Sequence, residues 1–571
     1  MAHQHQVSVT ADFSLSCRFR ELLPKQRKIF IFGFGILLLL TFFCFGQTLP
    51  ISADERCLNA SGKIGAVSTG HPQATKAAMK TLTHGGNAVD AAVAAAFALA
   101  VTDLSNSGIG GEGFALIRLK SGKIEAWDGS IKLPRSGKTV GCIAGLPSEP
   151  ALLIELLKRH GTLSLPDVMA PAIRLAEEGF EVSPYLEMLL MKRLRYVRDS
   201  SCFAVFAPMG RPLRAGEKLV QPILARTLRG IAADGGESFY RGESAKILVN
   251  DLTKRGSRYT LEDFMSYLPK STDPVSLQVG KFTFIGTPPP SSSVVAMALA
   301  ADILSIGKIP SGKDLIPFCL PLIQKAIYVK NKYLPACLYN PRKFFTYYND
   351  LKYFDVNNTK SDSDSENFPP EQPPETTHLV TWDGTGMVVS MTLTLGMHFG
   401  SGDYSPLGFF YNGELKNYTY NKKQVQDSYP QDIGPISSKA PLIVLEDSAP
   451  VLAIGGAGNN RIISNVGLIS AFCLSHAMTL TQAVNHPRMY FSGKGDAYME
   501  WSPEFSDLSS VKGKWKNLKV TDAGSDYFGL ISAIHAASDT LIAVGDYRRD
   551  GCAGAVTKKD AETSHRFQTR E

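Results

Sequence analysis

Hydrophobic and polar residues follow three kinds of pattern along the chain. Residues 29–49 (IFIFGFGILLLLTFFCFGQTL) carry no charge, and ~21 residues at ~1.5 Å rise per residue cross a ~30 Å hydrocarbon core. The alanine-dense run within residues 76–102 (NAVDAAVAAAFALAVT) has small side chains that pack closely, which predicts a buried helix. Alternating apolar positions, as in MVVSMTLTL, predict strands. We therefore expect a membrane segment followed by a body that mixes helices and strands.

The body alternates helix-rich and strand-rich blocks. The 3.6-residue spacing in APAIRLAEEGF predicts helix within residues 145–180, and residues 217–270 are expected to be mostly helical with a turn at ADGGESFYRGE. Strands are predicted for FALIRL, for residues 282–285, and for TTHLVTW, PLIVLE and VLAIGG, and further helices for residues 461–476 and 480–484. These blocks lack the regular βαβ rhythm of a parallel sheet.

A glycine-rich loop follows the alanine-dense helix. Gly108, Gly110 and Gly113 match the spacing G-x-G-x-x-G. A dinucleotide-binding fingerprint requires a strand, then the glycines, then a helix, with an acidic residue ~20 positions further on. Here the helix comes first, the strand follows the loop, and position 133 is Leu133. We therefore exclude nucleotide binding at this loop.

Composition and charge narrow the class of protein. The 571 residues are 44% hydrophobic and 20% charged, which excludes a disordered chain, a coiled coil and a collagen-like fibre. At ~150 residues per domain the length suggests three or four domains, although one large layered domain also fits. The net charge is +7, but residues 1–28 hold five basic and two acidic side chains, so the rest carries only +4. Because this body is nearly neutral and has no basic run, we expect no nucleic-acid partner.

The basic residues also orient the apolar segment. They precede residues 29–49, so the positive-inside rule makes residues 1–28 a cytoplasmic tail and residues 29–49 a transmembrane signal anchor. The remainder is then an extracellular or lumenal ectodomain of a single-pass type II membrane protein. The alternative is a cleaved signal peptide, but its apolar core usually spans only ~7–15 residues.

The cysteines and the glycosylation sequons bear on the chemistry and the compartment of the ectodomain. Seven of the nine cysteines lie in the ectodomain without a CxxC pair, and the chain has no HExxH, so the sequence indicates neither zinc nor thioredoxin chemistry. Three N-x-S/T sequons suit an extracellular body and make Asn59, Asn357 and Asn417 candidates for glycosylation.

A sharp change of composition occurs at Thr376. Residues 360–375 (KSDSDSENFPPEQPPE) are acidic and proline-rich, which predicts an exposed, flexible segment, whereas TTHLVTW follows at once. If the Glu375–Thr376 bond is cut, Thr376 gains an α-amine with a pKa of ~7.7–8.0, which can accept the proton of its own hydroxyl. Alternatively, Thr376 and Thr377 simply begin a strand, where threonine is favoured.

Six segments together indicate a family. In chain order they are GNAVDAAVAAAFALAV with SGIGGEGF, APAIRLAEEGFEVSP, LARTLRGIAADGGESFYRG, TPPPSSS, TTHLVTWDG and GPISSKAPLI. Over about residues 63–556 the chain resembles the gamma-glutamyltransferase (glutathione hydrolase) family. The resemblance implies an α+β fold, the αββα sandwich of N-terminal-nucleophile hydrolases, and a precursor that cuts itself before Thr376. The products would be a large subunit that includes residues 50–375 and a small catalytic subunit, residues 376–571, and no metal or cofactor is implied.

The resemblance also implies a reaction. The Thr376 hydroxyl would attack a small-molecule γ-glutamyl amide, such as glutathione, and form a threonine ester. Water would then complete hydrolysis, whereas an amino acid or dipeptide would complete transfer of the γ-glutamyl group.

Further site residues carry over by position. Thr394 matches the family's second threonine. The backbone N–H groups of Gly458 and Asn459 match the oxyanion hole, although the family usually has glycine at the second position. The resemblance assigns Glu414 to the substrate α-amine, and Ser437 and Ser438 to the substrate α-carboxylate.

Three positions depart from the family pattern. Ser130, in WDGSIKLP, replaces an arginine that binds the substrate carboxylate. Asn417 replaces an aspartate that pairs with the α-ammonium, and Gly396 replaces an asparagine. Each charge-assisted hydrogen bond contributes ~1.5–3 kcal/mol, so these changes weaken the expected γ-glutamyl pocket.

Three hypotheses therefore remain open: a γ-glutamyl ectoenzyme, a hydrolase of the same fold with another acyl specificity, and a catalytically inactive homologue. A conventional serine hydrolase is disfavoured because the chain has no G-x-S-x-G elbow. We interpret His378 as a packing residue, and Arg488 and Asp546 as structural residues.

Overall fold

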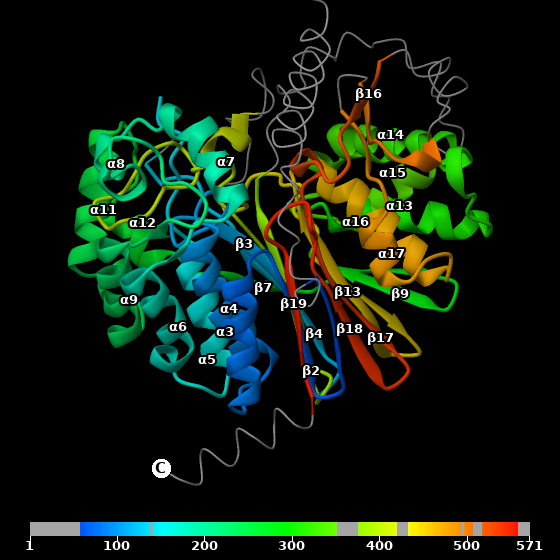
Figure 1. Ribbon diagram of the computed structural model, residues 1–571, viewed down its shortest axis with the longest axis horizontal. Coiled ribbons are helices and arrows are strands. Elements are labelled where there is room, and N and C mark those ends of the chain that lie inside the picture. Colours follow the sequence, from blue (N-terminus) through cyan, green and yellow to red (C-terminus); the bar gives the residue numbers. More distant parts are fainter. Residues whose placement is uncertain are drawn as a thin grey trace, which may run out of the picture. The chain divides into compact units, whose positions relative to one another are not determined.

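Two antiparallel seven-stranded sheets lie face to face at the centre of the fold (Figure 1). The computed structural model describes residues 58–136, 141–350, 375–419, 432–492, 496–505 and 517–557. The predicted membrane segment, residues 29–49, and nearly all of the acidic segment before Glu375 lie outside these ranges. Within them, every helix is too short or too polar to cross a bilayer.

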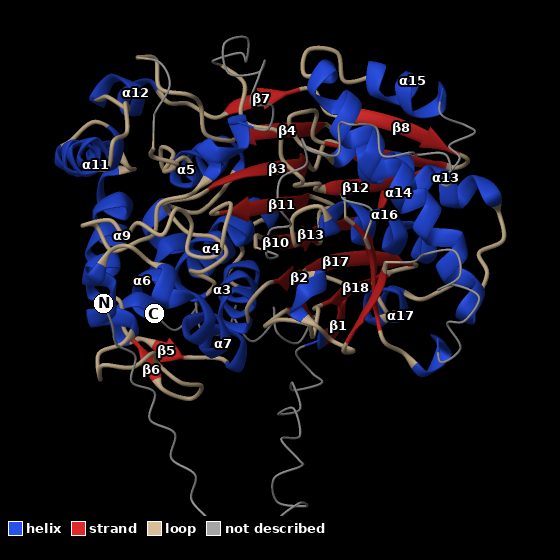
Figure 2. Cartoon of the chain, turned by 90° about the horizontal axis from the view of Figure 1, so that it is seen from above, coloured by secondary structure: helices blue, strands red, loops and turns tan. Residues whose placement is uncertain are grey.

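The two sheets differ in strand order, and strands distant in the sequence are neighbours in both. The first sheet runs β1 (Asn59–Gly62), β18 (Thr540–Val544), β17 (Leu530–Ala537), β13 (Ala449–Ala457), β12 (Leu442–Glu446), β9 (Phe282–Gly286) and β8 (Val275–Val279). The second sheet runs β19 (Cys552–Val556), β2 (Gly65–Thr69), β10 (Thr377–Asp383), β11 (Val388–Thr394), β3 (Glu112–Arg118), β4 (Ile124–Gly129) and β7 (Lys270–Thr272). Figure 2 shows the strands in red between the helices.

Helices cover the outer face of each sheet. The second sheet is covered by α3 (Pro72–Thr83), α4 (Ala88–Thr102), α5 (Glu149–His160), α6 (Leu165–Glu178), α9 (Pro222–Asp234), α10 (Glu237–Tyr240), α11 (Glu243–Lys254) and α12 (Leu261–Ser266). The first sheet is covered by α13 (Ser293–Ile306), α14 (Leu315–Tyr333), α15 (Lys343–Asp350), α16 (Arg461–Leu474) and α17 (Leu480–Asn485). The αββα sandwich expected from the resemblance is therefore confirmed.

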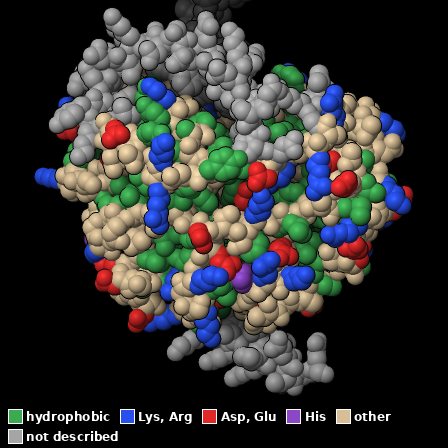
Figure 3. Space-filling view, turned by 180° about the vertical axis from the view of Figure 1, so that it is seen from behind, with side chains coloured by type: hydrophobic (Ala, Val, Ile, Leu, Met, Phe, Trp, Pro, Cys, Tyr) green, Lys and Arg blue, Asp and Glu red, His purple; other side chains and the backbone are tan. Residues whose placement is uncertain are grey.

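Each of the three layer boundaries is apolar. Every residue of α4 is buried, and its small side chains pack on second-sheet residues such as Leu379 and Met391. Between the sheets, Leu116 and Val380 meet Ile443 and Ala453 from the first sheet. A sheet that is apolar on both faces has to be covered on both, which explains the four layers. On the outside, basic and acidic side chains are interspersed on the face shown in Figure 3.

Segments before and after Thr376 contribute to both sheets. In the second sheet, β10 pairs with β2, β11 pairs with β3, and β19 pairs with β2. In the first sheet, β12 pairs with β9 and β18 pairs with β1. The two predicted subunits are therefore one layered domain, joined by hydrogen-bonded ladders.

Several local predictions need adjustment. The alanine-dense region forms two helices, α3 and α4, because residues 84–87 (HGGN) interrupt it and Asn87 caps α4 with a capping box to Asp90. The region 217–270 contains four helices, and the order helix, glycine loop, strand around Gly110 is as expected. Of the cysteines, Cys552 is disulfide-bonded.

Candidate active site

Thr376 and Thr394 face each other at one end of the second sheet. Thr377 begins β10 and pairs with Leu393 near the end of β11, so the preceding and following residues are neighbours in an antiparallel ladder. The Oγ1 atoms of Thr376 and Thr394 lie 3.0 Å apart. Thr376 is only 4% exposed, so its hydroxyl is held in one place by a second hydroxyl.

The backbone at Thr376 is strained. Its φ is +92°, in a region that β-branched residues essentially avoid. Such conformations cost ~1–3 kcal/mol and persist only where the surroundings enforce them. One enforcing contact is the hydrogen bond from Arg549 Nη1 to the Thr376 carbonyl oxygen, at 3.0 Å.

The predicted oxyanion hole lies beside the peptide bond that joins Glu375 to Thr376. β13 ends at Ala457, and the N–H of Gly458 donates a 2.8 Å hydrogen bond to the Glu375 carbonyl oxygen. Gly458 and Asn459 have φ values of +123° and +57°. Asparagine is one of the few residues that adopt the left-handed region readily, which explains why Asn459 can stand where the family usually has glycine.

Glu375 is buried together with this bond. Its Oε2 atom has no hydrogen-bond partner among the described residues. Burial raises the pKa of the Glu375 carboxyl to about 7, while Lys416 partly opposes that rise.

Ser437 and Ser438 precede β12, and Ser438 contacts the loop of residues 458–460 that follows β13. Because this loop contains the predicted oxyanion hole, we call it the oxyanion loop. Ser438 Oγ lies 3.2 Å from Asn459 Oδ1 and 2.8 Å from Asn460 Oδ1. Ser437 Oγ accepts a 3.2 Å hydrogen bond from the N–H of Lys439. The structure thus brings Ser437 and Ser438 to the same loop as Gly458 and Asn459.

A lysine that was not predicted from the sequence forms a hydrogen bond with this serine pair. Lys330 of α14 donates to Ser438 Oγ at 2.9 Å and to Asn460 Oδ1 at 2.5 Å. Burial lowers the pKa of Lys330 to about 7.

Glu414 lies in a cluster of charges next to Gly396, two residues after Thr394. Its Oε2 atom accepts a 2.5 Å hydrogen bond from Asn417 Nδ2. Lys439 Nζ lies 3.8 Å from Glu414 Oε1 and forms a buried ion pair with Glu112 of β3. Burial raises the pKa of Glu112 to about 7, while Lys439 opposes the rise. Neither Glu112 nor Lys439 was predicted from the sequence to be a site residue.

Gly396 connects this cluster to the threonines. Its N–H donates to Thr394 Oγ1 at 2.9 Å, and its φ is +76°. A Cβ atom at Gly396 would lie 2.6 Å from Glu414 Oε1. The asparagine that the family has at this position would therefore collide with Glu414 as it lies here.

Ser130 is fully buried, with 0% exposure. Its Oγ donates to the Asp128 carboxylate and accepts a 3.0 Å hydrogen bond from Lys132 Nζ. A Cβ atom on Gly434 would lie only 1.8 Å from Ser130 Oγ, so the loop before Ser437 packs directly on this serine. The next residue is in contact with the charged cluster, because the N–H of Ile131 donates to Glu112 Oε2 at 2.7 Å.

The remaining predicted residues have simpler surroundings. His378 is buried, 2.8 Å from Thr392 Oγ1, and burial lowers its pKa to about 3, so it is neutral and packs between strands. Arg488 pairs with Asp546 at 2.8 Å in a buried network.

The three glycosylation candidates differ in their surroundings. Asn59 is exposed on β1, and its Oδ1 accepts a 2.8 Å hydrogen bond from Thr481. The Nδ2 of Asn417 is engaged with Glu414, whereas Asn357 lies outside the described residues.

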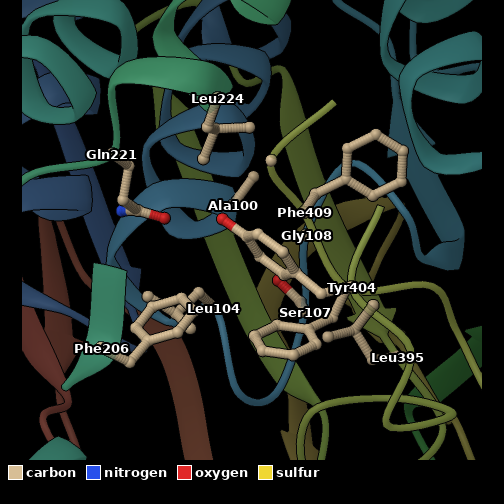
Figure 4. Close-up of a pocket in the computed structure, with 12 residues that line it drawn as sticks. Ala100, Leu104, Ser107, Gly108, Phe206, Gln221, Leu224, Leu395, Tyr404 and Phe409 are labelled. Atoms are coloured by element: carbon tan, nitrogen blue, oxygen red, sulfur yellow. The ribbon is translucent and has the colours of Figure 1, made fainter. Parts of the chain in front are cut away.

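A separate apolar pocket reaches the end of β11 (Figure 4). Phe206, Tyr404 and Phe409 line it together with Leu395, the residue after Thr394. No charged side chain lines this pocket, so the polar groups suited to catalysis are those around Thr376.

Comparison with known proteins agrees with this geometry. The family model described as "Gamma-glutamyltranspeptidase" matches residues 74–311 and 346–556. "Glutathione hydrolase 3" of Arabidopsis thaliana is 30% identical over 75% of this chain and 72% of its own length. "Acylase ACY 1 proenzyme" of Pseudomonas sp. (strain SE83) is 30% identical over 91% of this chain and 99% of its own.

A solved structure gives the same result at the level of the fold. The cephalosporin acylase from Bacillus halodurans has a TM-score of 0.77 and 25% identity, and the match covers 89% of this chain and 99% of that chain. The paired threonines, the oxyanion loop and these matches have one explanation: the chain is an enzyme of the gamma-glutamyltranspeptidase family.

Proposed function

We propose that this chain cuts itself before Thr376 and then hydrolyses or transfers γ-glutamyl groups, with glutathione and related small amides as substrates. The observation that carries the proposal is the 2.8 Å hydrogen bond from the Gly458 N–H to the Glu375 carbonyl oxygen, directly beside the Thr376 hydroxyl. A hydrogen-bond donor on a carbonyl oxygen stabilises the negative charge that develops when a nucleophile attacks its carbon.

Self-cleavage follows from these positions. Thr376 Oγ1 attacks the Glu375 carbonyl carbon, and negative charge builds up on the oxygen that Gly458 holds. The C–N bond then breaks, the nitrogen of Thr376 takes up the proton, and an ester links Glu375 to Thr376 Oγ1. Water hydrolyses this ester, which leaves a carboxylate on Glu375 and a free α-amine on Thr376. Cutting the bond also releases the backbone strain at Thr376.

The new α-amine then acts as the base in each catalytic cycle. In its neutral form it accepts the hydroxyl proton as Thr376 Oγ1 attacks the substrate γ-carbonyl. Thr394 holds the hydroxyl in place, and Gly458 stabilises the oxyanion. The leaving amine takes up the proton, and water or an acceptor amine then removes the acyl group from the threonine ester.

We further propose that residues 29–49 anchor the enzyme as a single-pass type II membrane protein with its catalytic body outside the cytosol. The support is the uncharged segment with basic residues on its N-terminal side. The same arrangement would keep both cleavage products at the membrane, because β10 and β11 pair with strands that precede Thr376.

Lys439 favours a second candidate function, the same chemistry on a different acyl group. Its ammonium lies 3.8 Å from Glu414 Oε1, the carboxylate assigned to the substrate α-amine, and pairs with Glu112. An internal cation at this position lowers the attraction for a substrate ammonium. An acyl group with a terminal carboxylate and no α-amine, such as glutaryl, fits this charge pattern.

Two measurements test these functions. On a denaturing gel, the purified protein should give two bands, and Thr376→Ala should give one full-length band. Release of aniline from γ-glutamyl anilide and glutaryl anilide then distinguishes the two acyl groups. A single band from the native sequence, with neither anilide cleaved, would refute both functions and favour an inactive homologue.

A further inference from the structure

Lys330 is a buried cation without a buried anion. Its side chain belongs to α14, and the residue is 8% exposed. No carboxylate oxygen of a described residue lies within 4 Å of Lys330 Nζ, since its contacts there are a hydroxyl and an amide oxygen. Buried charges in proteins are ordinarily paired, because removing a charge from water is costly. This lysine is therefore suited to receive an anionic ligand.

Among the described residues, the ammonium of Lys330 also leaves one of its donors without a partner. An ammonium group carries three N–H bonds, and two of them reach Ser438 Oγ and Asn460 Oδ1. Ser438 Oγ lies in turn 3.2 Å from Asn459 Oδ1, and Asn459 follows Gly458 in the oxyanion loop. Only the Ser438 hydroxyl therefore separates the Lys330 ammonium from Asn459, in the loop that is proposed to bind the reacting carbonyl.

Two other lysines near the threonines already have anionic neighbours. Lys439 pairs with Glu112, and Lys416 is attracted by both Glu375 and Glu414. At position 130, where the family has its arginine, Ser130 is buried against Gly434. Neither of these lysines, nor the residue at position 130, therefore offers an uncommitted cation to a substrate carboxylate.

We propose that Lys330, acting with Ser438, binds the terminal carboxylate of the substrate's acyl group and sets the specificity of this enzyme for carboxylated acyl groups. The proposal rests on the proposed function and deepens it, because it names the group that selects the acyl part. In the complex the Ser438 hydroxyl donates to the carboxylate while it accepts from Lys330. Burial lowers the pKa of Lys330 to about 7 in the free protein, and a bound carboxylate would raise it again.

Three anilides separate this role from a general effect on catalysis. γ-Glutamyl anilide has both the carboxylate and the α-amine, glutaryl anilide has only the carboxylate, and γ-aminobutyryl anilide has only the amine. We expect Lys330→Met to lower kcat/KM about 10- to 100-fold for the two carboxylated anilides, mainly through KM. The γ-aminobutyryl anilide should change less than about twofold, and Lys330→Arg should restore most of the loss.

The matched control is Lys332→Met, the same change on the same helix at an exposed position. It should leave all three anilides unaffected. A loss in Lys330→Met that is equal for all three substrates, or no loss at all, would overturn the proposal. Thermal unfolding of each variant shows whether the fold is intact.

Binding of glutarate, measured by calorimetry, tests the same lysine without catalysis. We expect the native enzyme to bind glutarate and Lys330→Met to bind it at least tenfold more weakly. If the native enzyme cleaves no anilide but glutarate binding still depends on Lys330, the proposed function fails and this inference stands. If the native enzyme cleaves the carboxylated anilides but glutarate binds equally to Lys330→Met, the inference fails alone. Failure to cleave the anilides and to bind glutarate overturns both.

Discussion

The N–H of Gly458 donates a 2.8 Å hydrogen bond to the carbonyl oxygen of Glu375. This carbonyl belongs to the peptide bond whose other side is Thr376, with its hydroxyl 3.0 Å from that of Thr394. A donor, a nucleophile and a strained backbone thus meet at one bond before any substrate is present. In the proposed mechanism the Gly458 N–H stabilises the oxyanion both in self-cleavage and in turnover, which leads to the first prediction.

Gly458→Ala should slow self-cleavage. The φ of Gly458 is +123°, and an added Cβ would lie 3.1 Å from Gly529 Cα, so alanine strains the loop and shifts its N–H away from Glu375. Loss of an oxyanion donor typically costs ~10²–10³ in rate. The rate is read from gel bands after synthesis.

Gly280→Ala is the matched control for this substitution. Gly280 also has a positive φ, +58°, but an added Cβ there meets nothing within 4 Å. The Gly280→Ala variant should cut itself at the native rate. Equal rates for both variants would contradict the expectation that strain at Gly458 displaces the N–H and slows cleavage.

Thr394→Val should impair both cleavage and turnover. Valine keeps the shape but removes the hydroxyl that contacts Thr376 Oγ1 at 3.0 Å and accepts the Gly396 N–H at 2.9 Å. We expect at least a tenfold loss in both rates, measured by gel time course and by anilide hydrolysis. Thr394→Ser keeps the hydroxyl and should retain most activity. If serine is as impaired as valine, packing of the methyl group matters instead.

Glu375 should make the precursor less stable as the pH rises. Burial raises the pKa of its carboxyl to about 7, above the ~4.3 of an unfolded glutamate. Between these values the unfolded chain releases the proton first, so the free energy of unfolding falls by up to ~1.4 kcal/mol per pH unit. In the uncleaved Thr376→Ala background, Glu375→Gln should remove this component.

Urea unfolding from pH 4 to 8 measures the effect. The difference in free energy of unfolding between the Gln variant and its parent should grow with pH. Glu178→Gln, at an exposed position of α6, is the control and should leave the pH dependence unchanged. A constant difference for Glu375→Gln would show that its carboxyl does not titrate in this range.

Lys330 should set the alkaline limb of the pH profile of kcat/KM for glutaryl anilide. Because burial lowers its pKa to about 7, the free enzyme loses this positive charge as the pH rises above 7. The α-amine of Thr376 must be neutral, so it sets the acid limb, and the two limbs together give a bell. In Lys330→Arg the cation persists at all pH values used, and the alkaline limb should disappear. An identical profile in both proteins would contradict this assignment.

Ser130→Arg should destabilise the protein without restoring a family-like pocket. Ser130 is fully buried, and the Gly434 backbone packs on its hydroxyl. Overpacking costs ~1–3 kcal/mol or more, which should lower Tm by several degrees. Ser130→Ala is smaller and should lower Tm less. A higher kcat/KM for γ-glutamyl anilide in Ser130→Arg, at unchanged Tm, would mean that the loop at Gly434 moves aside.

The layered fold could be predicted from motifs, but several elements could not. Helix α13 is buried along most of its length, so its sequence lacks the polar face that reveals an amphipathic helix. Pro321 lies inside α14 and reads as a helix breaker in sequence. The strands β18 and β19 have only five residues each, too few for a clear alternation.

The site residues also divide into those that could be predicted from the sequence and those that could not. Thr376, Thr394 and the loop at Gly458 could be proposed as site residues because they lie within recognisable segments, whereas Lys330 and Lys439 could not. A lysine reads as a solvated residue in sequence, and only the packing of α14 and the contact with Glu112 reveal that both are buried. Likewise, the sequence shows only that Gly396 replaces an asparagine, whereas the structure shows that Glu414 occupies the space next to it.

If the chain cuts itself before Thr376 as proposed, the interleaving of the two sheets makes the cut depend on correct folding. Strands from both sides of the bond pair with each other, β10 with β2 and β12 with β9, so a misfolded chain would present no aligned bond. Those pairings form within one polypeptide, where each strand has a high effective concentration of its partner. Once the bond is cut, reassembly becomes a bimolecular reaction that depends on protein concentration. A chain that is cut in this way would therefore fold most readily before cleavage, while its strands are still joined.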